Sequence, residues 1–151
     1  MISLEKIEQA LEIIKKNVIT TPLVYSPSLS KRFYGNIYLK MENLQRTGSF
    51  KIRGAGYKLA VRKDSIGEGG VVAASAGNHA QGIALAANTT GIPSTVVMPE
   101  WASISKQEAT RSYGGNVVLY GKSIGESLKK AKEIAEKGKT FVHPFDDEDI
   151  I

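Results

Sequence analysis

Short apolar runs and polar turns alternate regularly over the second half of the chain. The runs resemble β-strands and begin 23, 22 and 24 residues apart, near Val71, Ser94, Asn116 and Thr140. Helical patterns are predicted between them, near residues 78–88, 103–113 and 123–137. Strands separated by single helices require right-handed crossovers and so predict a parallel sheet. Because the runs are mostly apolar, we expect an open α/β fold with helices on both faces of the sheet.

The helix predicted over residues 123–137 has the clearest pattern. Ser123 and Glu126 have the spacing of a capping box, and Gly138 is placed to end the helix. A buried stripe is expected at Ile124, Leu128, Ala131 and Ala135.

The first forty residues give weaker signals. Ser3 can cap a helix that runs to about Asn17, with one apolar face made by Leu4, Ile7, Leu11 and Ile14. An extended segment over residues 20–25 precedes a short helix with Pro27 at its first position. Residues 36–41 then resemble a strand, which we expect to be the first strand of the parallel sheet.

Composition sets the class of protein. The 151 residues suit one domain, or one domain and part of another, and the 42% apolar content suits a soluble globular protein. Cysteine is absent, and no apolar run approaches the ~20 residues that cross a bilayer. The first ten residues lack a signal-peptide pattern, so we expect a cytoplasmic protein without a membrane partner.

The net charge of +5 comes from 20 basic and 15 acidic residues. The lysines are spread along predicted helices, often next to glutamate, and no ladder of aromatic and basic residues accompanies them. This distribution favours solvated helix faces over a nucleic-acid surface.

Unusual residues gather where the predicted strands end. In open parallel sheets, ligands bind outside the carboxyl ends of the strands. The segments expected at that edge are residues 41–43, 75–79, 98–99 and 143–145.

Residues 48–55 place Lys51 at the opening turn of a predicted helix. A lysine in this position can form an imine with an aldehyde cofactor. Gly54 and Gly56 each cost the helix ~1 kcal/mol relative to alanine, which indicates close approach of a ring or another backbone. The alternative is a surface lysine on a helix whose glycines serve packing.

Residues 75–82 form a small, polar turn that leads into a helix. The small side chains leave backbone N–H groups open, Gly77 permits positive φ, and Asn78 can donate a hydrogen bond, so a carboxylate or phosphate would fit. The alternative is an ordinary capped helix start, with His79 lining the turn. His79 and His143 have no cysteine or carboxylate at ligand spacing, so a metal site is not favoured.

These two segments carry a resemblance. Residues 42–55, with the sequence Glu-Asn-Leu-Gln-Arg-Thr-Gly-Ser-Phe-Lys-Ile-Arg-Gly-Ala, and residues 75–82, with the sequence Ser-Ala-Gly-Asn-His-Ala-Gln-Gly, resemble the threonine dehydratase (threonine ammonia-lyase) family. These are pyridoxal-phosphate enzymes of the tryptophan-synthase-β type. The resemblance extends over essentially the whole chain, including residues 21–23 and 143–147.

The resemblance implies a role for each candidate site residue. Lys51 would bind pyridoxal 5'-phosphate covalently and remove the α-proton of the substrate. Phe50 would pack beside the cofactor ring, and Asn78 would bond its 3′-oxygen. The substrate carboxylate would lie at Ser75, Gly77, Asn78 and His79.

The reaction implied is α,β-elimination of L-threonine or L-serine, which gives a 2-oxo acid and ammonia. Serine racemases resemble the same pattern but carry a second serine at the position of Ala76, which here cannot transfer a proton. Elimination is therefore favoured over racemisation.

The resemblance also predicts an incomplete chain, because family members are at least twice as long. Residues 1–35 are expected to pack on a larger domain, and residues 36–151 to form the smaller α/β domain. Without that domain, the apolar face of the first helix should bind another copy or be poorly ordered. A homo-oligomer is expected for the full-length protein. The alternative function is a non-catalytic α/β module that binds an anion or a partner chain.

Overall fold

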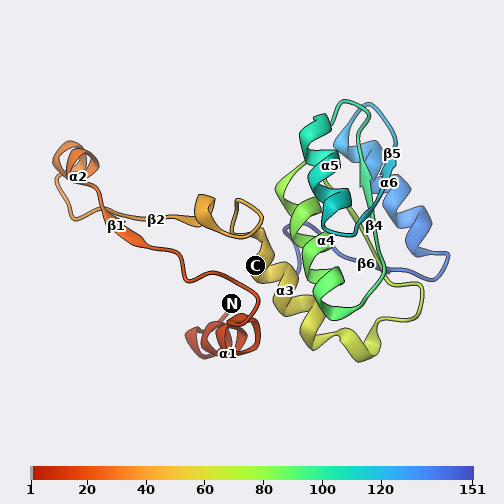
Figure 1. The fold of residues 1–151 in the computed structure, drawn as a ribbon, viewed down its shortest axis with the longest axis horizontal. Coiled ribbons are helices and arrows are strands. Elements are labelled where there is room, and N and C mark those ends of the chain that lie inside the picture. Colours follow the sequence, from red (N-terminus) through yellow and green to blue (C-terminus); the bar gives the residue numbers. More distant parts are fainter. Residues whose placement is uncertain (1) are drawn as a thin grey trace.

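The computed structural model of the protein describes residues 2–151 (Figure 1). Four parallel strands form its central sheet, in the order β5-β4-β3-β6. They are β3 (Val71–Ala74), β4 (Ser94–Met98), β5 (Asn116–Leu119) and β6 (Thr140–Phe141). Each begins at the residue that the sequence predicted, and the predicted α/β fold with a parallel sheet is confirmed.

Helices cover both faces of this sheet. On one side lie α3 (Lys51–Val61), α4 (Asn78–Thr90) and α5 (Ile104–Ser112), and on the other lies α6 (Ile124–Ala135) (Figure 1). The strand order runs outward from β3 to β5, whereas β6 lies on the other side of β3. The order therefore reverses between β3 and β6, which is where open parallel sheets form a binding crevice.

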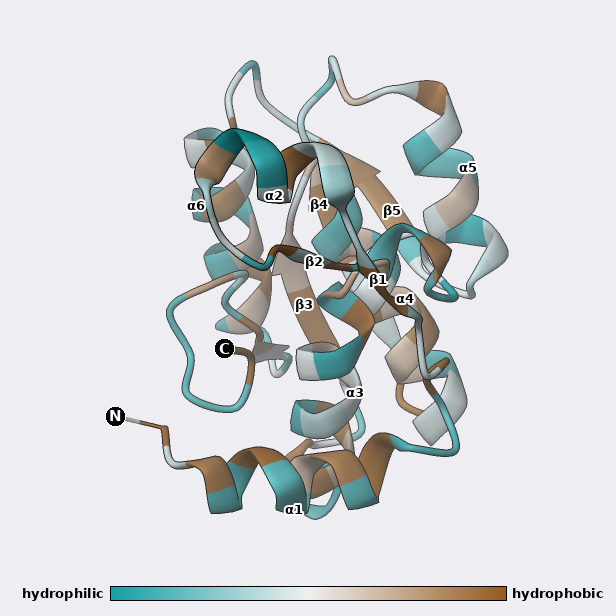
Figure 2. Ribbon diagram, turned by 90° about the vertical axis from the view of Figure 1, so that its left-hand side faces the viewer, coloured by the Kyte–Doolittle hydropathy of each residue, from teal (hydrophilic) through white to brown (hydrophobic). Residues whose placement is uncertain are grey.

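The core has two layers because successive side chains of β3 point to opposite faces. Val71 and Ala73 belong to the cluster with Ile52 and Leu59 of α3. Val72 and Ala74 belong to the cluster with Ala131 of α6. Figure 2 shows hydrophobic residues along these central strands. All four residues of β3 are buried, as an apolar strand between two helical layers should be.

The start of α6 follows the predicted capping pattern with two differences. Ser123 accepts the N–H of Glu126, as expected, but the Glu126 carboxylate accepts the N–H of Lys122 rather than that of Ser123. Ile124 is half-exposed, so its place in the predicted buried stripe was wrong. The fully buried Ser127 lies on the inner face instead, where its hydroxyl donates to the carbonyl of Tyr120.

The N-terminal helix α1 (Leu4–Ile14) begins after Ser3, whose side chain accepts the N–H of Lys6. It ends three residues before the predicted limit, in a turn that returns the N–H of Asn17 to the carbonyl of Ile14. Ile14 is buried against α3, but the rest of the apolar face is not in the core. Leu4, Ile7 and Leu11 are 69%, 55% and 49% exposed.

A separate arm projects from the α/β body. It consists of β1 (Leu23–Tyr25), α2 (Pro27–Phe33) and β2 (Tyr38–Lys40) (Figure 1). The strand predicted over residues 36–41 is therefore β2, and its expected place in the parallel sheet was wrong: it pairs antiparallel with β1. All three β2 residues are exposed, and Lys40 has no place in a strand covered on both faces.

Charged and amide side chains join this arm to α3. Glu42, in the short helix η1 (Glu42–Leu44), accepts from Nε and a terminal nitrogen of Arg53 at 2.8 and 2.7 Å. Gln45 exchanges two hydrogen bonds with the backbone of Ile19. A second short helix, η2 (Lys63–Ser65), connects α3 toward β3. Within residues 2–151, no helix has the length and apolarity that a membrane crossing requires.

Candidate active site

Lys51 reaches the edge of the sheet where the strand order reverses. It is the first residue of α3, and its Nζ donates to the backbone carbonyl of Pro144, which follows β6, at 3.1 Å. The residues predicted to share this edge therefore do so, except for residues 41–43, which follow a strand outside the sheet.

Glycines allow the helices around Lys51 to approach closely. A Cβ at Gly82 of α4 would lie 3.1 Å from the backbone carbon and oxygen of Lys51. A Cβ at Gly54 would lie 2.1 Å from the carbonyl oxygen of Ile150, so this glycine admits another backbone, one of the two predicted reasons. At Gly56 a Cβ would make only an ordinary contact with Ile14, at 3.7 Å.

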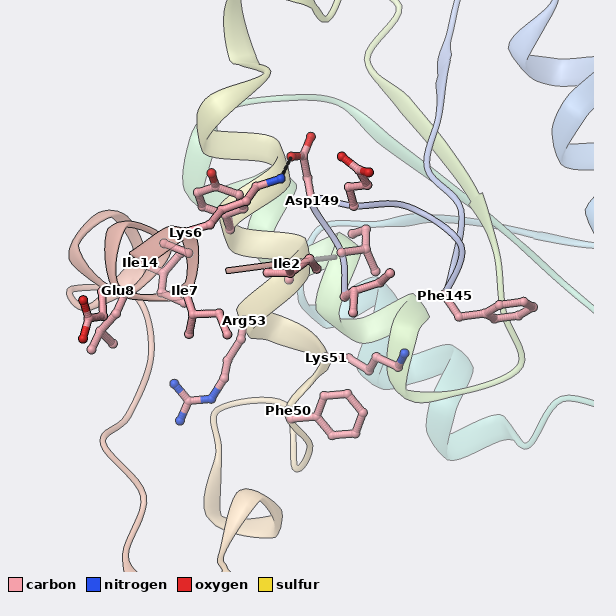
Figure 3. A pocket seen from close by; sticks show the side chains of 17 residues that line it. Ile2, Lys6, Ile7, Glu8, Ile14, Phe50, Lys51, Arg53, Phe145 and Asp149 are labelled. Atoms are coloured by element: carbon pink, nitrogen blue, oxygen red, sulfur yellow. Dashed lines mark ion pairs between the residues drawn. The ribbon is translucent and has the colours of Figure 1, made fainter. Parts of the chain in front are cut away.

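Two aromatic side chains flank the Lys51 amine (Figure 3). The Nζ atom lies 5.1 Å from the centre of the Phe50 ring, and Phe145 lies on the other side of the amine in this view. Both rings are more than half exposed and are free to contact a ligand.

An apolar hollow of about 590 Å³ lies between α1, α3 and residues 145–151, and Phe50, Lys51 and Phe145 are among the residues that line it. It includes none of residues 75–79. The amine of Lys51 points away from the α1 side of this hollow, toward the loop after β6 (Figure 3). The amine and the turn at residues 75–79 therefore lie outside the α1 side of this hollow.

The turn after β3 leaves the start of α4 without a side-chain cap. Ser75 accepts the N–H of Gly77 at 3.1 Å, but within residues 2–151 no hydrogen bond uses the N–H of Asn78 or His79. Gly77 has a φ of −162°, so the predicted need for positive φ does not arise. A Cβ at Gly77 would meet nothing within 4 Å, so the space in front of the turn is open.

Asn78 has a partner that the sequence analysis missed. Lys106, in the first turn of α5, donates from Nζ to Oδ1 of Asn78 at 2.8 Å. Lys106 lies in the first turn of the helix after the strand that ends at Met98, on the same edge of the sheet, but the sequence does not give the spacing between the two helix starts.

His79 lies behind the turn and is 4% exposed. Burial, with the nearby Lys51 ammonium as the second cause, lowers the pKa of His79 to about 4. The ring is therefore neutral near pH 7. The Val142 carbonyl favours its charged form, but neither ring nitrogen makes a hydrogen bond of good geometry in the described chain. The backbone N–H of His79 is thus the group that this residue offers to an anion.

The electrostatics of this edge favour anions. The first turns of α3, α4 and α5 contain no acidic residue, and Lys51 and Lys106 lie in two of them. Helix N-termini carry partial positive charge, which adds to that of the two ammonium groups. In the described residues 2–151, no three His, Asp or Glu side chains are grouped as metal ligands.

These features fit pyridoxal phosphate. Lys51 supplies an amine, and the start of α4 supplies free N–H donors. Asn78 supplies an amide, and the open space in front of Gly77 leaves room for a ligand. A lysine at the reversal point of a parallel α/β sheet, beside an uncapped helix start, defines a class of enzyme site that can hold an aldehyde cofactor and an anion.

Comparison with known proteins agrees with this class. Residues 14–151 match the model of the family described as "Pyridoxal-phosphate dependent enzyme". The chain belongs to this family, and the cofactor of the family is pyridoxal phosphate.

Relatives narrow the comparison. The chain is 53% identical to the L-threonine ammonia-lyase of Thermotoga maritima over 152 residues, which cover 100% of the chain and 38% of that protein. The chain thus spans about two fifths of this relative. Among solved structures, maize serine racemase matches with a TM-score of 0.89 at 33% identity, over 98% of this chain and 45% of that one. A processed threonine deaminase from Solanum lycopersicum matches with a TM-score of 0.82 at 38% identity, over 98% and 42%.

Proposed function

We propose that these residues belong to a lyase that eliminates the β-hydroxyl of L-threonine or L-serine and yields a 2-oxo acid and ammonia. The observation that carries the proposal is the position of Lys51. Its amine lies at the reversal point of the sheet, 3.1 Å from the Pro144 carbonyl, next to a helix start with free N–H groups. The 53% identity to an L-threonine ammonia-lyase supports the substrate class.

Lys51 would hold the cofactor covalently and, once the substrate amine has displaced it, would take the proton from the substrate Cα. The Pro144 carbonyl accepts a hydrogen bond from the amine, which keeps Nζ at this edge. Phe50, whose ring centre is 5.1 Å from Nζ, would pack against the cofactor ring. Bound pyridoxal phosphate supplies an electron sink for the electrons left on Cα.

Asn78 and the turn before it would position the ligands. The amide of Asn78 would donate a hydrogen bond to the 3′-oxygen of the cofactor. The substrate carboxylate would lie against Ser75 and Gly77, and against the free N–H groups of Asn78 and His79. A carboxylate that accepts from a helix start is favoured by both hydrogen bonds and the helix dipole.

The atoms of the reaction balance without an oxidant. The substrate loses a proton from Cα and its β-hydroxyl, which depart together as water. The enamine that is released takes water back, and hydrolysis gives ammonia and the 2-oxo acid. L-Threonine gives 2-oxobutanoate, and L-serine gives pyruvate.

Ala76 favours elimination over racemisation. Racemisation requires an acid or base on the face of Cα opposite Lys51. Ala76 has no transferable proton, and its side chain packs against the cluster of Ala80, Val96, Met98 and Ala102. The similarity to maize serine racemase, at 33% identity and a TM-score of 0.89, makes racemisation the alternative reaction within the family.

An assay of the encoded full-length protein tests the proposed reaction. L-Threonine should yield 2-oxobutanoate, K51A should abolish the activity, and K63R should retain it because Lys63 is exposed in η2. Chiral chromatography of the remaining serine should detect no D-enantiomer. D-Serine without 2-oxo acid would favour a racemase, and neither product would favour the non-catalytic, anion-binding module.

We also propose that the full-length protein is a homo-oligomer. In the 151-residue chain the exposed Leu4, Ile7 and Leu11 give α1 an apolar face that needs a partner, which would be the larger domain in the full-length protein and a second copy when that domain is absent. Sedimentation velocity of the full-length protein should show a species larger than one chain, and L11E should weaken self-association of the 151-residue chain. A monomer at all concentrations would contradict this proposal.

A further inference from the structure

Lys106 contacts Asn78, the residue that we propose binds the 3′-oxygen of the cofactor. Its Nζ atom lies 2.8 Å from Oδ1 of Asn78, and the two residues come from the first turns of adjacent helices, α5 and α4. We propose that Lys106 is a positioning residue, which fixes the Asn78 amide so that its NH₂ group faces the 3′-oxygen of the cofactor. This inference rests on the proposed function.

The chemistry of the two side chains determines the orientation of the amide. An ammonium group has three donors and no acceptor, so only the carbonyl end of an amide can face it. Oδ1 of Asn78 must therefore point to Lys106, and Nδ2 must point away. Within residues 2–151, Nδ2 makes no hydrogen bond and Asn78 is exposed, so both of its protons are available to a ligand.

Lys106 has no other evident role in stability. In the described chain it forms no ion pair with any carboxylate. It lies in the first turn of its own helix and against the start of α4, where the helix dipoles disfavour a cation. An anion at this edge would reverse that repulsion, so the position of Lys106 fits a site that is completed by its ligand.

The orientation matters because the two ends of the amide have opposite effects. The NH₂ group stabilises a negatively charged 3′-oxygen by donating a hydrogen bond to it. A reversed amide would instead turn its own carbonyl oxygen toward that charge and repel it. Lys106 would thus act on the cofactor through Asn78 without touching the reacting atoms.

The first measurement needs no cofactor. In the 151-residue chain, the side-chain ¹⁵N–¹H₂ signals of Asn78 are compared between wild type, K106M and K106R. We expect K106M to move them toward the values of a free asparagine side chain, because the amide can then rotate about its Cβ–Cγ bond. K106R keeps a donor and should retain signals near those of wild type. The matched control is K129M, since Lys129 is exposed on α6, on the opposite face of the sheet.

The second measurement is the pH dependence of the absorbance band of pyridoxal phosphate bound to the same variants. In K106M the NH₂ group of Asn78 is no longer held toward the cofactor, so the pH midpoint of the absorbance change should rise by about one unit. A shift of this size corresponds to the free energy of about one hydrogen bond to a charged group. K106R and K129M should keep the wild-type midpoint. K106A repeats the test if K106M lowers the melting temperature.

The outcomes separate the two proposals. Unchanged Asn78 signals and an unchanged midpoint in K106M and K106A, with Lys51 still carrying the cofactor, would overturn the role of Lys106 alone. If borohydride reduction finds no cofactor on Lys51, the proposed function fails and the inference about Lys106 fails with it.

Discussion

The Nζ atom of Lys51 donates a hydrogen bond to the backbone carbonyl of Pro144, although 93 residues separate them in the sequence. The contact joins the start of α3 to the loop after β6 across the reversal point of the sheet. Ion pairs hold that loop on α3: Lys58 binds Asp147 at 2.6 Å, and Arg62 binds Asp149 at 2.8 Å. The position of the amine therefore depends on the packing of residues 144–150 against α3.

The D149A variant should destabilise the protein. Asp149 is 8% exposed and faces Arg62, Lys58 and Lys6, so its removal leaves three cations without their shared carboxylate. We expect a loss of about 1–3 kcal/mol in the free energy of unfolding, measured by urea denaturation. The control D146A removes an exposed carboxylate and should change it by less than about 0.5 kcal/mol. Equal effects of the two variants would contradict this account of the loop.

The Glu42–Arg53 pair predicts a dependence of stability on pH. The hydrogen bonds from Arg53 are the main reason that the pKa of Glu42 falls to about 2, below the usual glutamate value of 4.5. A lowered carboxyl pKa gives stability that is complete above the unfolded pKa and is lost as the pH falls from about 5 toward 2.

E42Q should remove this component of the pH dependence. Because solvent reaches the pair, we expect it to account for about 1–2 kcal/mol between pH 5 and pH 2.5. E8Q, which changes an exposed residue of α1, serves as the control. The prediction would be contradicted if the free energy of unfolding fell with pH equally in wild type and E42Q over this range.

Two alanine substitutions in α3 should have opposite effects. G54A would force a methyl group to 2.1 Å from the carbonyl oxygen of Ile150, so it should destabilise by about 1–3 kcal/mol or more. G56A meets only the Ile14 side chain at 3.7 Å and should stabilise by up to about 1 kcal/mol, because alanine favours the helix. Thermal unfolding of both variants measures the contrast. A stable G54A would mean that residue 150 does not lie against α3.

Phosphate should bind at the turn after β3. The described chain already contains the N–H groups left free at this turn and the start of α4, whose dipole favours an anion. Titration should move the backbone amide signals of Gly77, Asn78 and His79 first, with sodium chloride at equal ionic strength as the control. Shifts elsewhere with this turn unmoved would show that the anion site is misplaced.

The sequence was sufficient for the sheet and for the placement of Lys51. Apolar runs starting at Val71 and Ser94 identify strands buried on both faces, and the parallel rule then places the following turns on one edge. The partner of β2 was not predictable, because a three-residue exposed strand carries no pattern that selects its neighbour. Lys106 was missed for a different reason: a contact between two adjacent helix starts depends on their spacing, which only the packed structure supplies.

The central claim is that Lys51 carries the cofactor, and reductive labelling tests it most directly. The 151-residue chain is mixed with pyridoxal phosphate, reduced with borohydride, digested and mapped by mass spectrometry. We predict that the label lies predominantly on Lys51, that K51A removes it, and that K63R leaves it in place. Label spread evenly over the lysines, or retained at wild-type level in K51A, would contradict the account.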